Sequence, residues 1–138
     1  MYIKRQRINL AVTASAGASQ AFYSDFIAGG GFVEALQYTP ATASNIATGA
    51  HITVTAERSG LTIWTATATG TLTRYPHAQA QDVSGGGLGY TSAATPPPVP
   101  CKIPVAQERV KAEVTSGGAA SGTVGGLKGI LDLYISGV

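Results

Sequence analysis

The chain contains 138 residues, enough for one ordinary domain and too few for two. Charged residues make up 12% of it and the formal net charge is +2, whereas roughly 25% charged residues is usual. Such weak charge excludes a strongly basic surface that would gather nucleic acid or anionic lipid. The 44% of apolar residues excludes charge-driven disorder, and no apolar run is long enough for a transmembrane helix.

The first segment has the outline of a signal peptide, because basic residues precede a short apolar stretch. The basic residues are Lys4, Arg5 and Arg7. The apolar stretch is shorter than the roughly 7–15 residues that a signal peptide needs. We therefore predict a β-strand over Tyr2–Thr13 with Ile8, Leu10 and Val12 on one face, and synthesis in the cytoplasm.

Two further strands are predicted before residue 40. Ala21–Phe26 follows a turn-rich segment and forms the first of them. Gly29–Gly31 is interpreted as a strand breaker. Phe32–Thr39 then forms a strand that Pro40 ends.

The clearest alternation of apolar and polar residues predicts a β-hairpin. Its strands are His51–Glu57 and Leu61–Thr69, joined by a turn at Arg58–Gly60. Regular alternation places Ile63 on one face of the second strand and Trp64 on the other.

The remaining strand predictions complete an all-β fold. They are Thr71–Tyr75, which Pro76 ends, then Arg109–Thr115 and Ile130–Ile135. The charged face of Arg109–Thr115 is expected to meet water. About eight short strands with glycine-rich turns indicate a β-sandwich or jelly-roll-like fold, as a single domain over residues 1–138.

Two connections are long and rich in glycine or proline. The segment 82–100 combines a glycine run with the prolines Pro96, Pro97, Pro98 and Pro100. It suits a stiff arm that crosses to a neighbouring subunit, and equally a crossover loop between two sheets. Ser116–Gly129 is interpreted as a hairpin tip.

No motif for chemistry is present. Gly125–Gly129 lacks the Ser or Thr that follows lysine in a phosphate loop. His51, His77 and Cys101 have no metal-ligand spacing, and no Gly-x-Ser-x-Gly elbow occurs. We expect no enzyme, no cofactor and no metal. The single Cys101 is expected to be a small buried or half-buried apolar side chain.

The aromatic side chains allow two interpretations. They could form a platform for a carbohydrate, or fill the core and a subunit interface. An exposed Trp64 would favour the carbohydrate platform and a buried one would oppose it. The residues concerned are Trp64, Tyr38, Tyr75, Tyr90 and Tyr134.

The order of these segments resembles small structural proteins of tailed double-stranded DNA bacteriophages, which are encoded among head and tail genes. The resemblance spans nearly the whole chain, and the proline run Pro96–Pro98 departs from it. It rests on the following segments: Lys4–Thr13, Ala21–Asp25, Val33–Tyr38, Gly49–Thr55, Arg74–Pro76, Ile103–Lys111 and Gly129–Ser136.

The resemblance implies a capsid decoration or minor capsid protein that binds the outside of the head and stabilises the capsid lattice. Its expected partners are copies of itself, as a trimer, and the major capsid protein, with no specific nucleic acid and no membrane. The alternatives are a neck or tail ring component and a carbohydrate- or host-binding module. The expected contact residues are Tyr2, Lys4, Arg5, Arg7, Tyr90, Pro96, Pro97, Pro98 and Pro100.

Overall fold

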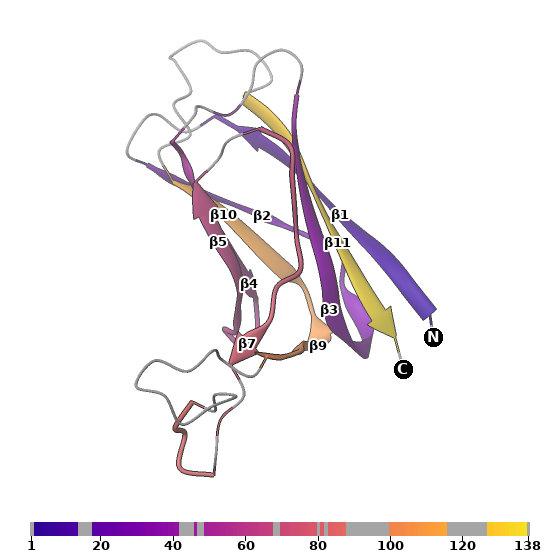
Figure 1. The fold of residues 1–138 in the computed structure, drawn as a ribbon. Helices are drawn as coiled ribbons and strands as arrows, with labels where there is room; N and C mark the ends of the chain where they lie inside the picture. The colour runs from indigo at the N-terminus through magenta and orange to yellow at the C-terminus, as the bar shows by residue number, and fades with distance from the viewer. Residues whose placement is uncertain are drawn as a thin grey trace.

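The computed structural model describes residues 2–13, 18–41, 46, 49–67, 70–79, 81, 83–87, 100–115 and 127–137. Within these ranges the chain forms eleven strands and no helix, so the predicted all-β, sandwich-like fold class is confirmed (Figure 1). No described segment is a helix that could span a membrane. The strands are β1 Tyr2–Val12, β2 Ser19–Tyr23, β3 Ile27–Pro40, β4 His51–Ala56, β5 Thr62–Thr67, β6 Leu72–Arg74, β7 Ala78–Gln79, β8 Pro100–Cys101, β9 Ile103–Glu108, β10 Val110–Thr115 and β11 Leu127–Gly137.

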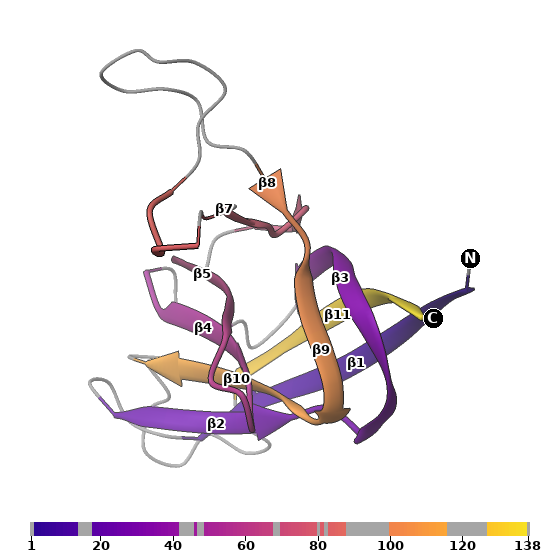
Figure 2. The same ribbon diagram turned by 90° about the horizontal axis from the view of Figure 1, so that it is seen from below.

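The first sheet has the antiparallel order β1-β11-β3-β6, with β9 also paired to β3. β11 lies between β1 and β3, and its paired residues run from Leu127 to Gly137. On its other side, β3 pairs with β9 over its first half and with β6 over its second half. β3 stays paired with β11 from Gly31 to Pro40 and arches beyond the end of that ladder at residues 27–30, where β9 runs along it (Figure 2).

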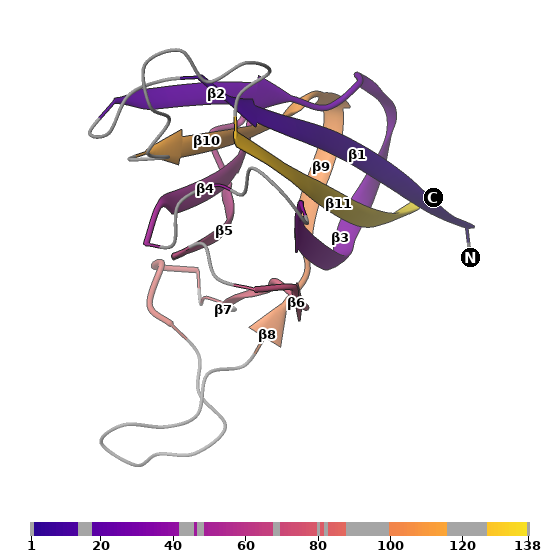
Figure 3. The same cartoon turned by 90° about the horizontal axis from the view of Figure 1, so that it is seen from above.

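The second sheet has the order β2-β10-β4-β5 and faces the first (Figure 3). Its inner face carries small and β-branched residues that pack well on a pleated surface. Val110, Ala112 and Val114 of β10 are fully buried, and the predicted alternation of this strand is confirmed. The opposite face of β10 is charged and partly exposed, as predicted.

The core lies between the two sheets and collects the alternating apolar residues of both. Ile8, Leu10 and Val12 of β1 are buried on one face, as predicted. Leu131, Leu133 and Ile135 of β11 face the same way. Ile52, Val54 and Ala56 of β4 close the core from the second sheet.

The predicted hairpin is present, but its second strand is irregular. Val54 pairs with Trp64 and Thr55 with Thr62, so Ile63 is an extra residue in β5. Such a bulge turns two successive side chains toward one face. Ile63 is therefore buried, while Trp64 packs beside it against the core, and the prediction of opposite faces was wrong.

The prediction that Gly29–Gly31 breaks the chain was also wrong. β3 begins at Ile27 and runs through all three glycines. Its register against β9 shifts by one residue between Ile27 and Gly30. The glycines allow this bulge and the close approach of β3 to β11 instead of ending the strand.

Other strand predictions change in extent. β11 is longer than the predicted Ile130–Ile135, because it begins at Leu127, inside the predicted hairpin tip Ser116–Gly129, and runs to Gly137. The second predicted strand ends at Tyr23, because Ser24 turns inward and its hydroxyl accepts a hydrogen bond from Val110 N (2.9 Å). The strand predicted at Arg109–Thr115 is preceded by β9, for which the alternation analysis had no prediction.

A buried carboxylate joins the two sheets where β9 passes into β10. Glu108 is only 6% exposed. Its Oε2 accepts hydrogen bonds from the backbone N–H groups of Arg58 and Ser59, both at 2.9 Å. The Ser59 hydroxyl donates to Oε1 at 3.3 Å. The carboxylate thus fixes the β4–β5 turn to the corner between the sheets.

Tyr38 places a polar hydroxyl group inside the apolar core. Its ring is fully buried, and among the described residues its hydroxyl has no hydrogen-bond partner. Burial raises the pKa of this hydroxyl above its usual 10.0. An unpaired buried hydroxyl costs about 1–3 kcal/mol. We therefore expect Tyr38→Phe to raise the free energy of unfolding by about 1 kcal/mol in urea denaturation, and a loss of stability would contradict this reasoning.

Candidate interaction surface

β1 is an edge strand along its N-terminal half. Among the described residues its ladder partner is β11 alone. Near its other end, the backbone N–H of Thr13 donates to Oε1 of Gln20, beside β2 (2.9 Å). The side of Tyr2–Arg7 that faces away from β11 therefore presents unpaired backbone groups.

The alternation of β1 divides the expected contact residues between two faces. Lys4 lies on the inner face with Tyr2 and Gln6, while Arg5 and Arg7 lie on the outer face. Tyr2 is 66% exposed and Ile3 is 55% exposed. The N-terminal end of β1 lies beside the C-terminal end of β11, at one end of the molecule (Figure 1). Apolar side chains are therefore exposed where the unpaired edge begins.

Arg7 is tied to its own sheet. It faces Asp132 across the β1–β11 ladder and binds it through two hydrogen bonds, Nε to Oδ1 at 2.8 Å and Nη2 to Oδ2 at 3.0 Å. These hydrogen bonds raise the pKa of the Arg7 guanidinium. Asp132 is 5% exposed, so the pair lets a carboxylate lie buried on the outer face of β11. The guanidinium of Arg7 is therefore held by Asp132 of its own sheet.

Lys4 and Arg5 are placed differently from Arg7. Both are exposed, and neither forms an ion pair with the residues that the structure describes. Of the three basic residues of β1, Lys4 and Arg5 therefore carry the charges that are available to a binding partner.

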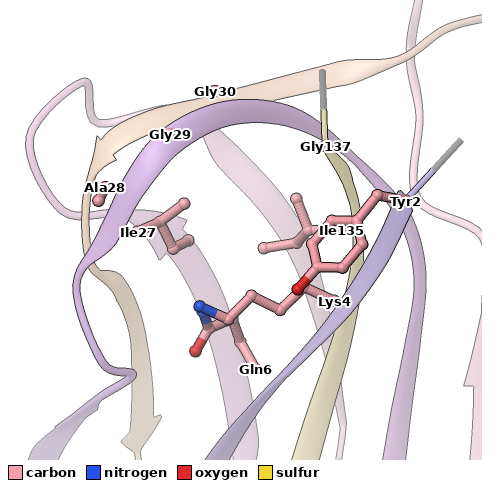
Figure 4. Close-up of a pocket in the computed structure, with 9 residues that line it drawn as sticks. All are labelled: Tyr2, Lys4, Gln6, Ile27, Ala28, Gly29, Gly30, Ile135 and Gly137. Carbon is pink, nitrogen blue, oxygen red and sulfur yellow. The ribbon is translucent and has the colours of Figure 1, made fainter.

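A pocket of about 240 Å³ lies beneath the arch of β3, beside the N-terminal end of β1. β1 contributes Tyr2, Lys4 and Gln6, which extend from the strand into the space below the arch (Figure 4). Ile135 of β11 and residues 27–30 of β3 form the other walls. The structure thus brings two predicted contact residues together with a glutamine that sequence reasoning missed.

Gln6 is the unexpected member of this pocket. It is 4% exposed, and its Nε2 atom has no hydrogen-bond partner in the described part of the chain. The signal was present in the sequence, since Gln6 has the same parity as Ile8 and Leu10 and so shares their face. A polar residue in a core-facing row is a useful marker of a site.

The predicted arm is only partly described. Tyr90, Pro96, Pro97 and Pro98 lie outside the described residues. Pro100 is exposed in β8, where it pairs with Gln79 of β7. The structure therefore does not place the arm against the β1 edge.

The prediction of a buried or half-buried Cys101 was wrong. The thiol is exposed. Cys101 lies in β8, whose short ladder with β7 belongs to neither main sheet, so neither of these sheets covers it with apolar side chains in the described part of the chain.

The described aromatic residues of this set differ in burial. Tyr38 is buried, and Trp64 packs half-buried against the core. Tyr75 is exposed and Tyr134 half-buried, while Tyr90 lies outside the described residues. A half-buried Trp64 is neither the exposed ring expected of a carbohydrate site nor the fully buried ring expected of the core.

His51 and His77 are both exposed, and His77 Nδ1 lies 3.3 Å from the backbone oxygen of Tyr75. Within the described ranges, no three histidine, cysteine, aspartate or glutamate side chains gather as metal ligands.

Comparison of the chain with protein-family models, curated proteins and solved structures gives no match.

Proposed function

We propose that this protein is a structural component of a phage virion, which binds the outside of the head and stabilises the capsid lattice. In this role it assembles as a homo-oligomer, a trimer, and contacts the major capsid protein. Its action is mechanical, since many small contacts on a lattice add up to stable attachment.

The observation that carries the proposal is the edge of β1 that faces away from β11, which pairs with no other strand among the described residues. An exposed strand edge is a template for an added strand from another chain. Here the edge ends in the exposed side chains of Tyr2 and Ile3. Proteins that work alone usually shorten, cover or charge such an edge. The edge of β1 is charged, and it is the exposed apolar side chains of Tyr2 and Ile3 beside it that support a role in assembly.

The charge of β1 favours one kind of neighbour over another. The strand contains Lys4, Arg5 and Arg7 and no acidic residue. Two copies of β1 paired about a two-fold axis would place like charges opposite each other, which is unfavourable. A strand with acidic side chains from a different surface suits this edge better.

The proposal is tested with purified protein and with capsid shells that lack it. Light scattering after size exclusion gives the mass, and co-sedimentation with shells gives binding. A trimer, or a monomer that co-sediments and raises the melting temperature of the shells, supports the decoration role. A hexameric ring or tube that does not bind shells contradicts it.

A neck or tail ring is the second candidate, and the charge pattern is compatible with it as well as with a trimer. An edge that does not pair with its own copy needs a head-to-tail contact, and such contacts close into a ring of three or more subunits when the rotation between subunits closes. The light-scattering experiment distinguishes the two, because only the ring reaches a defined high mass without shells.

A further inference from the structure

We infer that the pocket beneath the arch of β3 binds the carboxylate side chain of an extended peptide segment from a partner protein. This inference goes beyond the virion role. It concerns the chemistry that the pocket recognises and can be tested without any capsid.

The first argument is the unpaired amide of Gln6. Its Nε2 is buried at the pocket wall without a hydrogen-bond partner among the described residues. Leaving a buried donor unpaired is unfavourable, so such groups are usually satisfied by protein or water. Rotation about the last torsion of glutamine is soft, and it can turn the amide toward an incoming acceptor.

The second argument is the charge of the pocket. Lys4 brings an ammonium group to the same walls and has no ion-pair partner in the described chain. None of the nine residues that line the pocket is acidic. An ammonium and an amide N–H₂ are both donors, and a carboxylate is the acceptor that satisfies both with charge-assisted hydrogen bonds.

The apolar walls restrict the ligand further. Ile27 and Ile135 are buried side chains that face the pocket. They reduce the access of water, which strengthens hydrogen bonds made there. Together with Tyr2 they also favour an apolar side chain next to the carboxylate.

The surrounding backbone favours a peptide over a small acid. The β3–β11 ladder ends at the pair Gly31–Gly137, so residues 27–30 have no strand on that side within the described chain. β1 contributes three side chains to the pocket, and its edge away from β11 has no partner strand among the described residues. An extended peptide could bond to these backbone groups and direct alternate side chains into the pocket.

The experiment is a titration of the full-length protein followed by NMR of isoleucine methyl groups and glutamine side-chain amides. The probe is the blocked peptide acetyl-Thr-Val-Asp-Val-Thr-amide, and its Asn counterpart lacks only the charge. We expect the Asp peptide to shift the signals of Ile27, Ile135 and the Gln6 amide, with affinity about tenfold higher than the Asn peptide. Equal affinities, or acetate binding as tightly as the peptide, would overturn the inference.

Two variants and a matched control locate the effect. Gln6→Leu removes the donor from a buried position, so it should melt at an equal or higher temperature and yet lose the preference for Asp. Lys4→Gln should lose the same preference. Lys128→Gln removes the same charge from an exposed position on β11 outside the pocket lining and should keep it. If Lys128→Gln weakens binding as much as Lys4→Gln, the attraction is a general effect of charge and the pocket is not the site.

Discussion

Replacement of Gly31 by alanine is expected to lower the free energy of unfolding by about 3 kcal/mol, the upper end of the usual cost of overpacking. A Cβ atom at this position would overlap the backbone oxygen of Ser136 and lie 3.0 Å from Cγ2 of Ile135. The oxygen belongs to β11, the central strand of its sheet, and cannot move aside without shifting the ladder.

The neighbouring glycines provide the control. A Cβ atom at Gly29 meets nothing within 4 Å, and at Gly30 it makes an ordinary contact of 3.7 Å with Ala106. Gly29→Ala and Gly30→Ala should therefore stay within about 1 kcal/mol of the wild type. Urea denaturation of the three variants measures the difference. Equal losses at all three positions would show that the curvature of β3, rather than the contact with β11, requires glycine.

Replacement of Glu108 by alanine is expected to lower the free energy of unfolding by about 3 kcal/mol. The change leaves the N–H groups of Arg58 and Ser59 without their acceptor in a part-buried turn. Glu108→Gln keeps one acceptor oxygen and the shape of the side chain. It should cost about half as much, since a neutral hydrogen bond is about half as strong.

The effect of Glu108 depends on pH. Burial raises the pKa of its carboxyl, but the hydrogen bonds from Ser59, Arg58 and Ala106 lower it more, so the pKa lies below its usual 4.5. A lowered pKa in the folded state means that the carboxylate stabilises the fold above about pH 4.5. This contribution is lost as the pH falls through the lowered value.

Urea denaturation of the wild type and Glu108→Gln, from pH 7 to pH 3, measures this dependence. The difference in stability should be constant near neutral pH and shrink below about pH 4.5. Subtracting the two proteins removes the titration of Glu34 and Glu57, whose pKa values are also lowered. A difference that does not change with pH would contradict the role of the charged form.

Alternation in the sequence predicted the parts of the fold where strands are regular. Ile8, Leu10 and Val12 are buried together, as are Leu131 and Leu133. A side-chain period of two turns such a row toward one face whatever the neighbouring strand is. This is why the faces of β1 and β10 were predicted correctly.

Prediction failed where the chain departs from that period. The extra residue Ile63 brings Trp64 to the core side, and a bulge lets β3 pass through Gly29–Gly31. Bulges depend on how two strands meet, and neither strand alone contains that information.

The candidate site, like the fold, was predicted only in part. Lys4, Arg5 and Arg7 were predicted as contact residues. Only the ladder between β1 and β11 pairs Arg7 with Asp132, which leaves Lys4 and Arg5 without an ion pair among the described residues. The pocket could not be predicted, because its walls come from strands that are far apart in the chain.

The pattern of the residues was sufficient for an all-β fold, for the inward face of most long strands and for a weakly charged surface, because these follow from side-chain period and composition. The order of the strands, the arch of β3 and the burial of Gln6 and Glu108 depend on pairings between distant segments. Such pairings are selected by the packing of the whole core, so tertiary structure alone decided them.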